Sequence, residues 1–260
     1  MSRRLRPALR RWQLAALSLA LALGLWELLG RGGDPIMSSY PTAVLAAIGR
    51  DIASGHLLRA IVESLPPLVI GYSIAVCLGI PLGILLGRSK RAEAMLGFYF
   101  VGLDASPIIA FVPLFILWFG LGTTVKIAMV VVFCITPVVI NCWRGVRGVP
   151  SSLVEVGKSF GASRGQIAVK IVLPAALPSI LTGLRLAIGR AIIATAVAEI
   201  FTALSGLGGL LLRRSESYDT AGSLVPALVL MAMGIGFTSA LGALEKRLLS
   251  WFYDQAEHQP

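Results

Sequence analysis

The sequence predicts an all-α membrane protein with six transmembrane helices and a helix-turn-helix segment on the cytoplasmic side. Hydrophobic residues make up 56% of the 260 residues and charged residues only 14%. The mean hydropathy of +0.82 lies far above that of soluble domains. Six apolar runs are long enough to cross about 30 Å of hydrocarbon at about 1.5 Å per helical residue. These runs cover residues 12–29, 68–86, 98–119, 125–142, 181–204 and 224–244.

The net charge of +10 indicates membrane orientation rather than binding to nucleic acid. Basic residues gather in the short segments beside the apolar runs, where an excess of Lys and Arg marks the cytoplasmic side. With the N-terminus inside, fifteen Lys and Arg lie in internal segments and six in external ones. We therefore expect a multi-pass protein of the cell inner membrane, surrounded by the lipid bilayer. Residues 1–11 and 251–260 would be cytoplasmic, and residues 12–250 would form one transmembrane domain.

The first apolar run follows five arginines and has the small-x-small form of a signal-peptide cleavage site at residues 20–22. Because the run continues to Leu29, an uncleaved span is favoured over a signal peptide.

Two external stretches are predicted to be structured without crossing the lipid. The first, "YPTAVLAAIGRDI", begins a helix at Pro41, with apolar side chains at helical spacing; these are Val44, Leu45, Ile48 and Ile52. The second, residues 205–223, has glycines followed by a charged loop. Its glycines do not form a dinucleotide-binding loop, because their spacing is wrong and a helical membrane protein offers no βαβ unit.

The second span carries a small residue at every fourth position, which places a strip of small side chains on one helix face. The residues are Gly71, Ala75, Gly79, Gly83 and Gly87. Such strips allow the backbones of two helices to approach closely in lipid. We therefore expect this face to pack against another span.

The third span contains Pro107 and Pro113, which remove backbone hydrogen-bond donors. Irregular backbone is tolerated at membrane depth only inside protein or beside a water-filled cavity. Ser106, Pro107 and Phe111 are therefore candidates for lining a substrate pathway.

The stretch "EVGKSFGASRGQIAVKIVLP", within residues 150–174, predicts two short helices joined by a turn. Ser152 and Glu155 have the spacing of a capping box, and Ser163 and Gln166 repeat it. Gly161 between them supplies the residue that best adopts a left-handed, helix-ending conformation. The first helix presents Leu153, Val156 and Phe160 on one face, and the second carries Ile167 and Ile171 and is expected to end before Pro174.

The chain carries no site of its own for ATP, a metal ion or catalysis. Gly157-Lys158-Ser159 matches the end of a phosphate loop, but Ser152 stands where that pattern requires glycine and no strand precedes it. The three cysteines and two histidines, Cys77, Cys134, Cys142, His56 and His258, lack metal-ligand spacing. We therefore expect no cofactor and no metal bound by this chain.

At the same stretch the sequence resembles the permease subunits of ATP-binding-cassette importers. Their cytoplasmic loop has the form E-A-A, three residues, Gly, nine residues, I-x-L-P, and every spacing agrees here from Glu155 through Gly161 to Pro174. Val156-Gly157 replaces Ala-Ala, and glycine inside a helix costs about 1 kcal/mol relative to alanine. The stretches "PLFILWFGLG", "LPAALPSILTGLRLAIGRA" and "AEIFTALSGLGGLL" resemble the permeases of the aliphatic sulfonate, taurine and nitrate group.

The resemblance implies several partners and one coupling site. It implies two ATPase subunits that hold ATP and Mg²⁺, a second copy of the permease, and an external binding protein that delivers a small solute such as a sulfonate or nitrate. The loop that contacts the ATPase would include Glu155, Val156, Gly157, Ser159, Phe160, Gly161, Ala162, Ser163 and Arg164.

Ionisable side chains inside the spans are further candidates for the substrate pathway, because they cost about 2.5 to 3.5 kcal/mol at the bilayer centre. Arg190 and Glu199 qualify, and their separation places them on opposite faces of a straight helix. Arg190 is consistent with an interhelical ion pair or with attraction of an anion. Thr195 and Asn141 are consistent with capping and packing or with contact to the solute.

Two other classes of protein fit the sequence less well. An ion-driven secondary transporter predicts an inverted internal repeat and midplane ion ligands, and neither is clear here. An intramembrane enzyme needs a nucleophile, base or metal constellation, and the sequence holds no such set.

Overall fold

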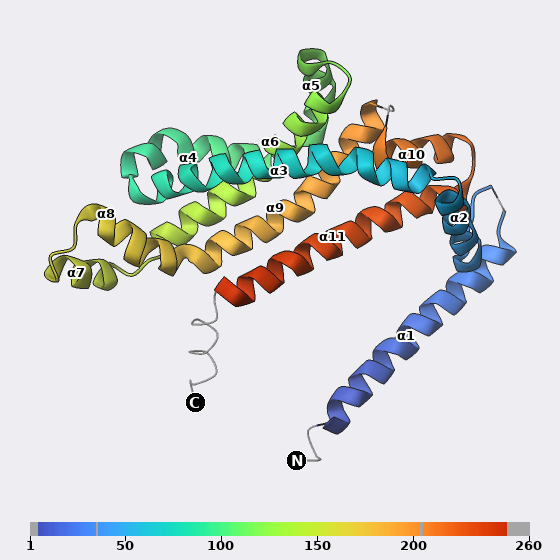
Figure 1. Cartoon of the computed structure of the whole chain (residues 1–260), viewed down its shortest axis with the longest axis horizontal. Helices are drawn as coiled ribbons and strands as arrows, with labels where there is room; N and C mark the ends of the chain where they lie inside the picture. The colour runs from blue at the N-terminus through green and yellow to red at the C-terminus, as the bar shows by residue number, and fades with distance from the viewer. Residues whose placement is uncertain (1–4, 35, 203–204, 249–260) are drawn as a thin grey trace.

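Helices form nearly all of the computed structural model, which describes residues 5–34, 36–202 and 205–248. No strand occurs among these residues, as the sequence predicts (Figure 1). The helices are α1 (Leu5–Gly32), α2 (Pro41–Ala53), α3 (His56–Arg88), α4 (Lys90–Ala105), η1 (Ile108–Phe111), α5 (Val112–Phe119), α6 (Thr123–Arg147), α7 (Ser151–Ser159), α8 (Arg164–Ile167), the π-helical η2 (Ala168–Val172), α9 (Leu173–Thr202), α10 (Gly206–Glu216) and α11 (Thr220–Leu248). The predicted C-terminal tail and His258 lie outside the described residues.

Five helices in the described part of the chain are long and apolar enough to cross a membrane, and a bent pair supplies a sixth span. The single helices are α1, α3, α6, α9 and α11. The pair consists of α4 and the segment Ile108–Phe119, which meet at 92°. The described residues of the predicted runs are therefore helical, except at Ser106 and Pro107, where the third span bends sharply.

The break comes from Pro107 and not from Pro113. Ser106 ends α4, and Pro107 separates it from η1. Pro113 lies in the first turn of α5, where the missing N–H group has no helical partner to lose. The expectation of irregular backbone is thus confirmed at Pro107 and wrong at Pro113.

The glycine strip of α3 packs against α6, as predicted. A Cβ atom added to Gly79 would lie 2.7 Å from Val138 Cγ1 on α6, and one added to Gly87 would lie 2.6 Å from Val146 Cβ. Four glycines of α3 each face an α6 side chain; the pairs are Gly71 with Val130, Gly79 with Val138, Gly83 with Cys142 and Gly87 with Val146. Ala75 between them is fully buried. Because these glycines have no side chain, the two helix backbones approach each other closely along the strip.

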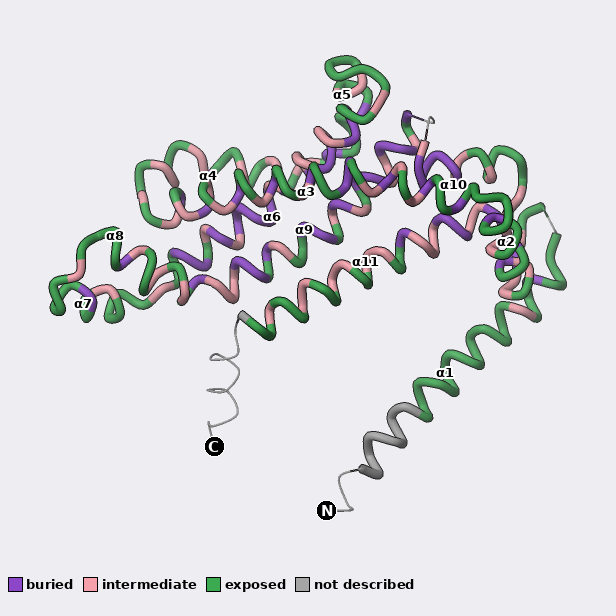
Figure 2. Tube along the Cα trace, viewed as in Figure 1, coloured by how far each residue is buried: buried purple, intermediate pink, exposed green. Residues whose placement is uncertain are grey.

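The same device joins α6 to α9. A Cβ atom on Gly145 of α6 would lie 2.6 Å from Ser179 Cβ, and one on Gly183 of α9 would lie 2.8 Å from Asn141 Cβ. Helix α6 thus lies between α3 and α9 and is the most buried of the spans. We call α3, α6 and α9 the three-helix core (Figure 2).

Helix α3 begins at His56, well before the predicted start of the second span at residue 68. Arg59 and Glu63 form an i,i+4 ion pair on its first turns, and Ser64 is fully buried against α9 and α10. A hydropathy run detects only the lipid-crossing part of such a helix, because these polar residues interrupt the apolar pattern.

Helices α1 and α2 lie at the edge of the molecule. The described leucines of α1 are exposed. Its contacts with the following segment include Trp26 Nε1, which donates to the Ser39 carbonyl at 2.8 Å, and Glu27, which accepts from Thr42 of α2. The predicted helix at Pro41 is confirmed as α2, but its predicted apolar face is partly wrong. Val44 is buried together with Ala47 and Asp51, and the larger Leu45 and Ile52 are exposed.

Helix α10 replaces the predicted charged loop. The basic pair Arg213 and Arg214 lies in its last turn, where positive charge favours a helix C-terminus. Arg214 pairs with the buried Asp51 of α2 and with Asp219, which explains why α2 turns a carboxylate inward. Helices α2 and α10 lie together at one end of the molecule, and α7 and α8 lie at the other (Figure 1).

We predict that Gly83→Ala will destabilise the protein by about 1 to 3 kcal/mol through overpacking. The added methyl group would lie 2.5 Å from Cys142 Cβ and 2.8 Å from the Val139 carbonyl oxygen, so α6 must shift. Gly24→Ala on α1 is the matched control, because its methyl group would meet nothing within 4 Å. Thermal unfolding in detergent checks both variants, and equal midpoints for the two would contradict close packing of α3 on α6.

Candidate functional site

The predicted turn at Gly161 is present between α7 and α8. Gly161 has φ of +72°, a conformation that side chains disfavour. The Ala162 N–H donates to the Gly157 carbonyl at 3.0 Å, and the Gly161 N–H donates to the Lys158 carbonyl at 2.9 Å. These bonds satisfy carbonyl groups at the end of α7 in the manner of a glycine-terminated helix.

Only the second predicted capping box is present. Ser163 Oγ accepts from the Gln166 N–H at 3.3 Å, and the Ser163 N–H donates to Gln166 Oε1 at 2.8 Å. The first box is wrong, because Pro150 is the N-cap residue of α7 and no side chain caps this end. The helix begins at Ser151, so Ser152 is already inside it and cannot cap. Glu155 is exposed and makes no capping hydrogen bond at the start of α7.

The second predicted helix does not end before Pro174. Helix α8 passes into the π-helical turn η2, and the chain continues without a break as α9. Pro174 has no N–H to give to a carbonyl one turn earlier, and a π-turn shifts the hydrogen-bond register at such a point. Residues 164–172 are therefore an N-terminal extension of the membrane-spanning helix α9, and α7 is joined to this extension by the turn at Gly161.

One face of α7 is apolar and uncovered. Leu153, Val156 and Phe160 are 44%, 54% and 86% exposed. Gly157, which neighbours these residues on the helix surface, is buried, and a Cβ atom there would lie 2.5 Å from Ile171 Cδ1. Glycine at this position therefore seats α7 on η2. A hollow of about 460 Å³ lies along this segment, lined by Val156, Gly157, Phe160, Gly161, Ala162, Gln166, Lys170 and Ile171.

The remaining residues of the predicted coupling segment are on its surface. Ser159 Oγ donates to the Glu155 carbonyl at 3.0 Å, so this hydroxyl group is hydrogen-bonded within α7. Ser163 and Arg164 are exposed, and the Arg164 carbonyl accepts from Arg88 Nη2 at 3.5 Å. The end of α3 therefore contacts the start of α8.

Among the pathway candidates, Arg190 pairs with two other helices. Arg190 Nη1 lies 2.6 Å from Asp104 Oδ1 on α4 and 3.0 Å from Thr136 Oγ1 on α6. The Arg190 and Asp104 side chains are 36% and 34% exposed. An interhelical ion pair, one of the two roles that the sequence allowed for Arg190, is thus present. Both side chains remain partly exposed.

Ser106, Pro107 and Phe111 lie together at the break between α4 and η1, close in sequence to Asp104. Ser106 Oγ donates to the Gly102 carbonyl at 2.7 Å. Pro107 is exposed, and Phe111 is about half exposed. These residues follow Asp104 along the chain, at the break and in η1.

Asn141 and Thr195 are occupied within their own helices. Asn141 Nδ2 donates to the Pro137 carbonyl at 2.8 Å, and its Cβ packs on Gly183. Thr195 is fully buried and donates to the Ala191 carbonyl at 2.9 Å. The structure leaves neither group aimed at an open space.

Glu199 is fully buried, and both oxygens of its carboxylate have partners. Ser64 Oγ donates to its carboxylate at 2.8 Å, the Gly208 N–H donates to Oε2 at 2.9 Å, and Lys126 Nζ lies 3.5 Å from Oε1. Lys126 also donates to Ser205 Oγ at 2.8 Å. A buried carboxylate with this set of partners is satisfied and does not face a pathway.

This network explains the glycines at the start of α10. Its first three N–H groups are satisfied by side chains of α3 and α9: Gly206 donates to Glu63, Leu207 to Ser64 and Gly208 to Glu199, each at 2.9 Å. Gly206 has φ of +87°, and a Cβ atom there would overlap the Glu199 carboxylate. The glycines therefore bring a helix N-terminus onto acidic groups.

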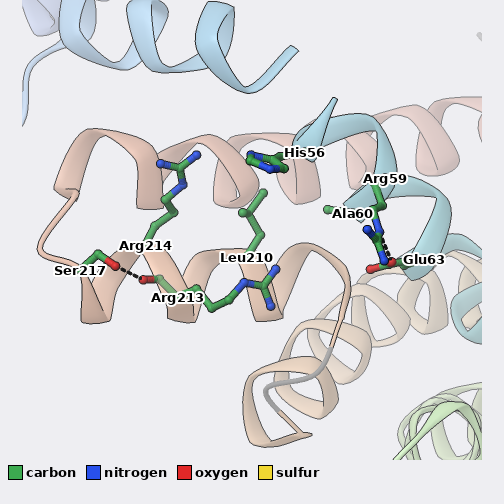
Figure 3. Close-up of a pocket in the computed structure, with 8 residues that line it drawn as sticks. All are labelled: His56, Arg59, Ala60, Glu63, Leu210, Arg213, Arg214 and Ser217. Carbon is green, nitrogen blue, oxygen red and sulfur yellow. Dashed lines mark hydrogen bonds and ion pairs between the residues drawn. The ribbon is translucent and has the colours of Figure 1, made fainter. Parts of the chain in front are cut away.

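A pocket of about 640 Å³ lies between the first turns of α3 and the C-terminal part of α10 (Figure 3). It is lined by His56, Arg59, Ala60, Glu63, Leu210, Arg213, Arg214 and Ser217. Arg59 pairs with Glu63, and Arg214 pairs with Asp51 and Asp219. The pocket is at the end of the molecule opposite α7 and α8.

Sequence reasoning missed the partners of the two charged candidates. Asp104 is itself an ionisable residue in an apolar run, so the rule that selected Arg190 would also have selected it. Lys126, at the start of the run 125–142, was not considered as a partner, although it is only 3% exposed. Thr136 and Ser64 carry no signal of their own, because hydroxyl groups are common in spans. In the described part of the chain, no group of three His, Cys, Asp or Glu residues could hold a metal ion.

Known proteins resemble the chain in both sequence and fold. A permease protein of Escherichia coli named for aliphatic sulfonates transport is 34% identical over 250 residues, which cover 93% of this chain and 94% of that protein. The taurine transport system permease protein of the same species is 31% identical over 264 residues, covering 96% and 94%. A formylaminopyrimidine transport permease protein of Halalkalibacterium halodurans is 30% identical over 228 residues, covering 87% and 91%.

A chain from the inward-facing MetNI methionine ABC transporter has the same fold, with a TM-score of 0.63 and 18% identity over 74% of this chain and 95% of that chain. Residues 79–250 match the family described as the binding-protein-dependent transport system inner membrane component. Together with the relatives of 30% identity or more, this match shows that the chain belongs to that family, the membrane-spanning permeases of ATP-binding-cassette importers.

Proposed function

We propose that two copies of this chain form the solute pathway of an importer driven by two ATPase subunits and supplied by an external binding protein. The observation that carries this proposal is the uncovered apolar face of α7, which ends in Phe160 at 86% exposure. A face of this kind marks a protein contact. Helix α7 is joined through the Gly161 turn to α8, which is continuous with α9, so movement of an ATPase would be passed to a membrane-spanning helix.

Other features support the roles of the partners. ATP and Mg²⁺ would be held by the ATPase subunits, since Ser152 removes the one phosphate-loop candidate in this chain. The excess of basic residues near α7 and α8 supports a cytoplasmic location for this end. The opposite end, with α2, α10 and the pocket of Figure 3, would then meet the external binding protein.

We further propose that the solute is a small oxyanion such as an aliphatic sulfonate. Two of the relatives are named for aliphatic sulfonates and taurine transport, and one is named for formylaminopyrimidine. Arg190 is a cation within a span and therefore favours a solute that carries an anionic group, because the two N–H groups of an arginine fork recognise oxyanions.

Reconstitution into liposomes tests the proposal. The chain with its ATPase subunits and loaded binding protein should take up solute only with ATP, and loaded binding protein should raise ATP hydrolysis. A ligand can bias such a cycle only by binding its states unequally. Uptake by the chain alone, driven by an ion gradient, would instead show a secondary transporter.

We predict that Gly161→Ala will reduce ATP-driven uptake while leaving membrane insertion intact. Alanine at φ of +72° costs roughly 1 kcal/mol or more, so the turn between α7 and α8 would open. Gly165→Ala is the matched control, because Gly165 lies in α8 with ordinary φ and open space around it. Uptake rates at equal expression separate the two variants, and equal rates would exclude a need for the turn.

We predict that Phe160→Ala will weaken binding of the ATPase subunit about tenfold, the loss of a moderate interface hot spot. The phenyl ring contributes little to the folded chain at 86% exposure, so the thermal midpoint should stay unchanged. Phe160→Leu, which keeps an apolar side chain, should bind nearly as well as the unaltered chain. Affinity measured on immobilised permease provides the check, and unchanged affinity for Phe160→Ala would remove α7 from the contact.

A further inference from the structure

The Arg190–Asp104 pair lies deep inside the membrane-spanning part of the chain. Arg190 and Thr136 are both near the middle of their helices, α9 and α6, and Asp104 is in the last turn of α4 before the 92° break. Three elements therefore meet at one guanidinium group. Such a depth is where a charge is most costly to expose to lipid.

The pair is nevertheless not enclosed by this chain. Both side chains are about one-third exposed, and a Cβ atom on the neighbouring Gly189 would meet nothing within 4 Å. Leu186 and Ile193, one turn before and after Gly189, are each 53% exposed. Because lipid cannot solvate the charges, this face of α9 must meet water or protein, as a pathway between two copies would provide.

The guanidinium group keeps unused donors. Both of its hydrogen bonds come from Nη1, one to Asp104 and one to Thr136. Toward the residues that the structure describes, Nε and Nη2 make no hydrogen bond. Arginine offers five N–H donors in a planar fork that fits two oxygens of one anion, so the group can accept a further oxyanion.

Glu199 shows what a purely structural charge looks like in the same helix. It is fully buried, and its carboxylate contacts Ser64, Gly208 and Lys126. Arg190 differs in each respect. Its side chain is partly exposed, it uses only part of its hydrogen-bonding capacity toward the described residues, and its ion-pair partner lies at the end of a broken span.

We infer that Arg190 is the pathway residue that binds the oxyanion group of the solute, with Asp104 as its counter-ion while the site is empty. This inference rests on the proposed function and specifies where the solute is recognised. An arriving sulfonate or nitrate group bonds to Arg190 and weakens its contact with Asp104. Since Asp104 is joined to the break at Ser106 and Pro107, solute binding also releases the end of α4.

The test uses the assembled transporter in lipid nanodiscs and thermal unfolding at constant ionic strength. The probes are sodium ethanesulfonate and sodium nitrate, with ethyl methyl sulfone as an uncharged control. The wild type should be stabilised by at least one anion and not by the sulfone, because a ligand stabilises the state that it binds. Asp104→Asn should respond at an anion concentration lower by about tenfold, within the range of ordinary coupling between charges.

The double variant Arg190→Gln with Asp104→Asn separates binding from a structural role. It removes both charges together, so no uncompensated charge remains, and its midpoint without anion should stay near that of the wild type. Its response to both anions should be lost, and its uptake of the solute should fall at least about tenfold. An Asp104→Asn variant that responds to neither anion would overturn the inference.

Uptake by the wild type and by the double variant distinguishes this inference from the proposed function. If the wild type shows no ATP-dependent uptake, the proposed function fails whatever Arg190 does. If the wild type transports its solute and the double variant transports it equally well, the importer stands and Arg190 is only a link between helices.

Discussion

Close approach of α3, α6 and α9 is the constraint on which the rest of the structure depends. Lipid gives little hydrophobic reward for bringing two apolar helices together, so packing of small residues must hold them. Here glycines of α3 face α6, and Gly145 and Gly183 bring α6 onto α9. A single added methyl group at these positions would meet side chains or backbone at less than 3 Å.

The functional features are attached to this three-helix core at three levels. At one end, η2 joins α8 to α9 without a break, and Arg88 of α3 contacts the Arg164 carbonyl. In the middle, Arg190 ties α9 to α6 and to the broken span. At the other end, Glu63, Ser64 and Glu199 hold the N-terminus of α10. The continuous helix from α8 to α9 is the connection through which the proposed coupling to an ATPase would act.

The sequence was sufficient to predict the features that depend on local pattern. The six apolar runs, the strip from Gly71 to Gly87, the turn at Gly161 and the second capping box all follow from spacing and residue type. Features that depend on distant partners were not predictable. The early start of α3 requires Glu199 and α10 to satisfy Ser64, and the helical state of residues 206–216 requires three acceptors from other helices. The first capping box failed because the N-cap of α7 is Pro150, two residues before the predicted Ser152.

Close packing of α3, α6 and α9 predicts a rigid three-helix core, and release of the broken span predicts movement of α5 relative to it; distances between spin labels test both most directly. After replacement of Cys77, the exposed native cysteine, one pair of labels at Leu85 and Leu186 reports on α3 and α9, and a second pair at Leu85 and Leu117 reports on α5. All three sites are exposed. Measured with and without ATP in labelled chains diluted by unlabelled ones, the first distance should stay constant and the second should change. A change in the first distance as large as that in the second would contradict the account.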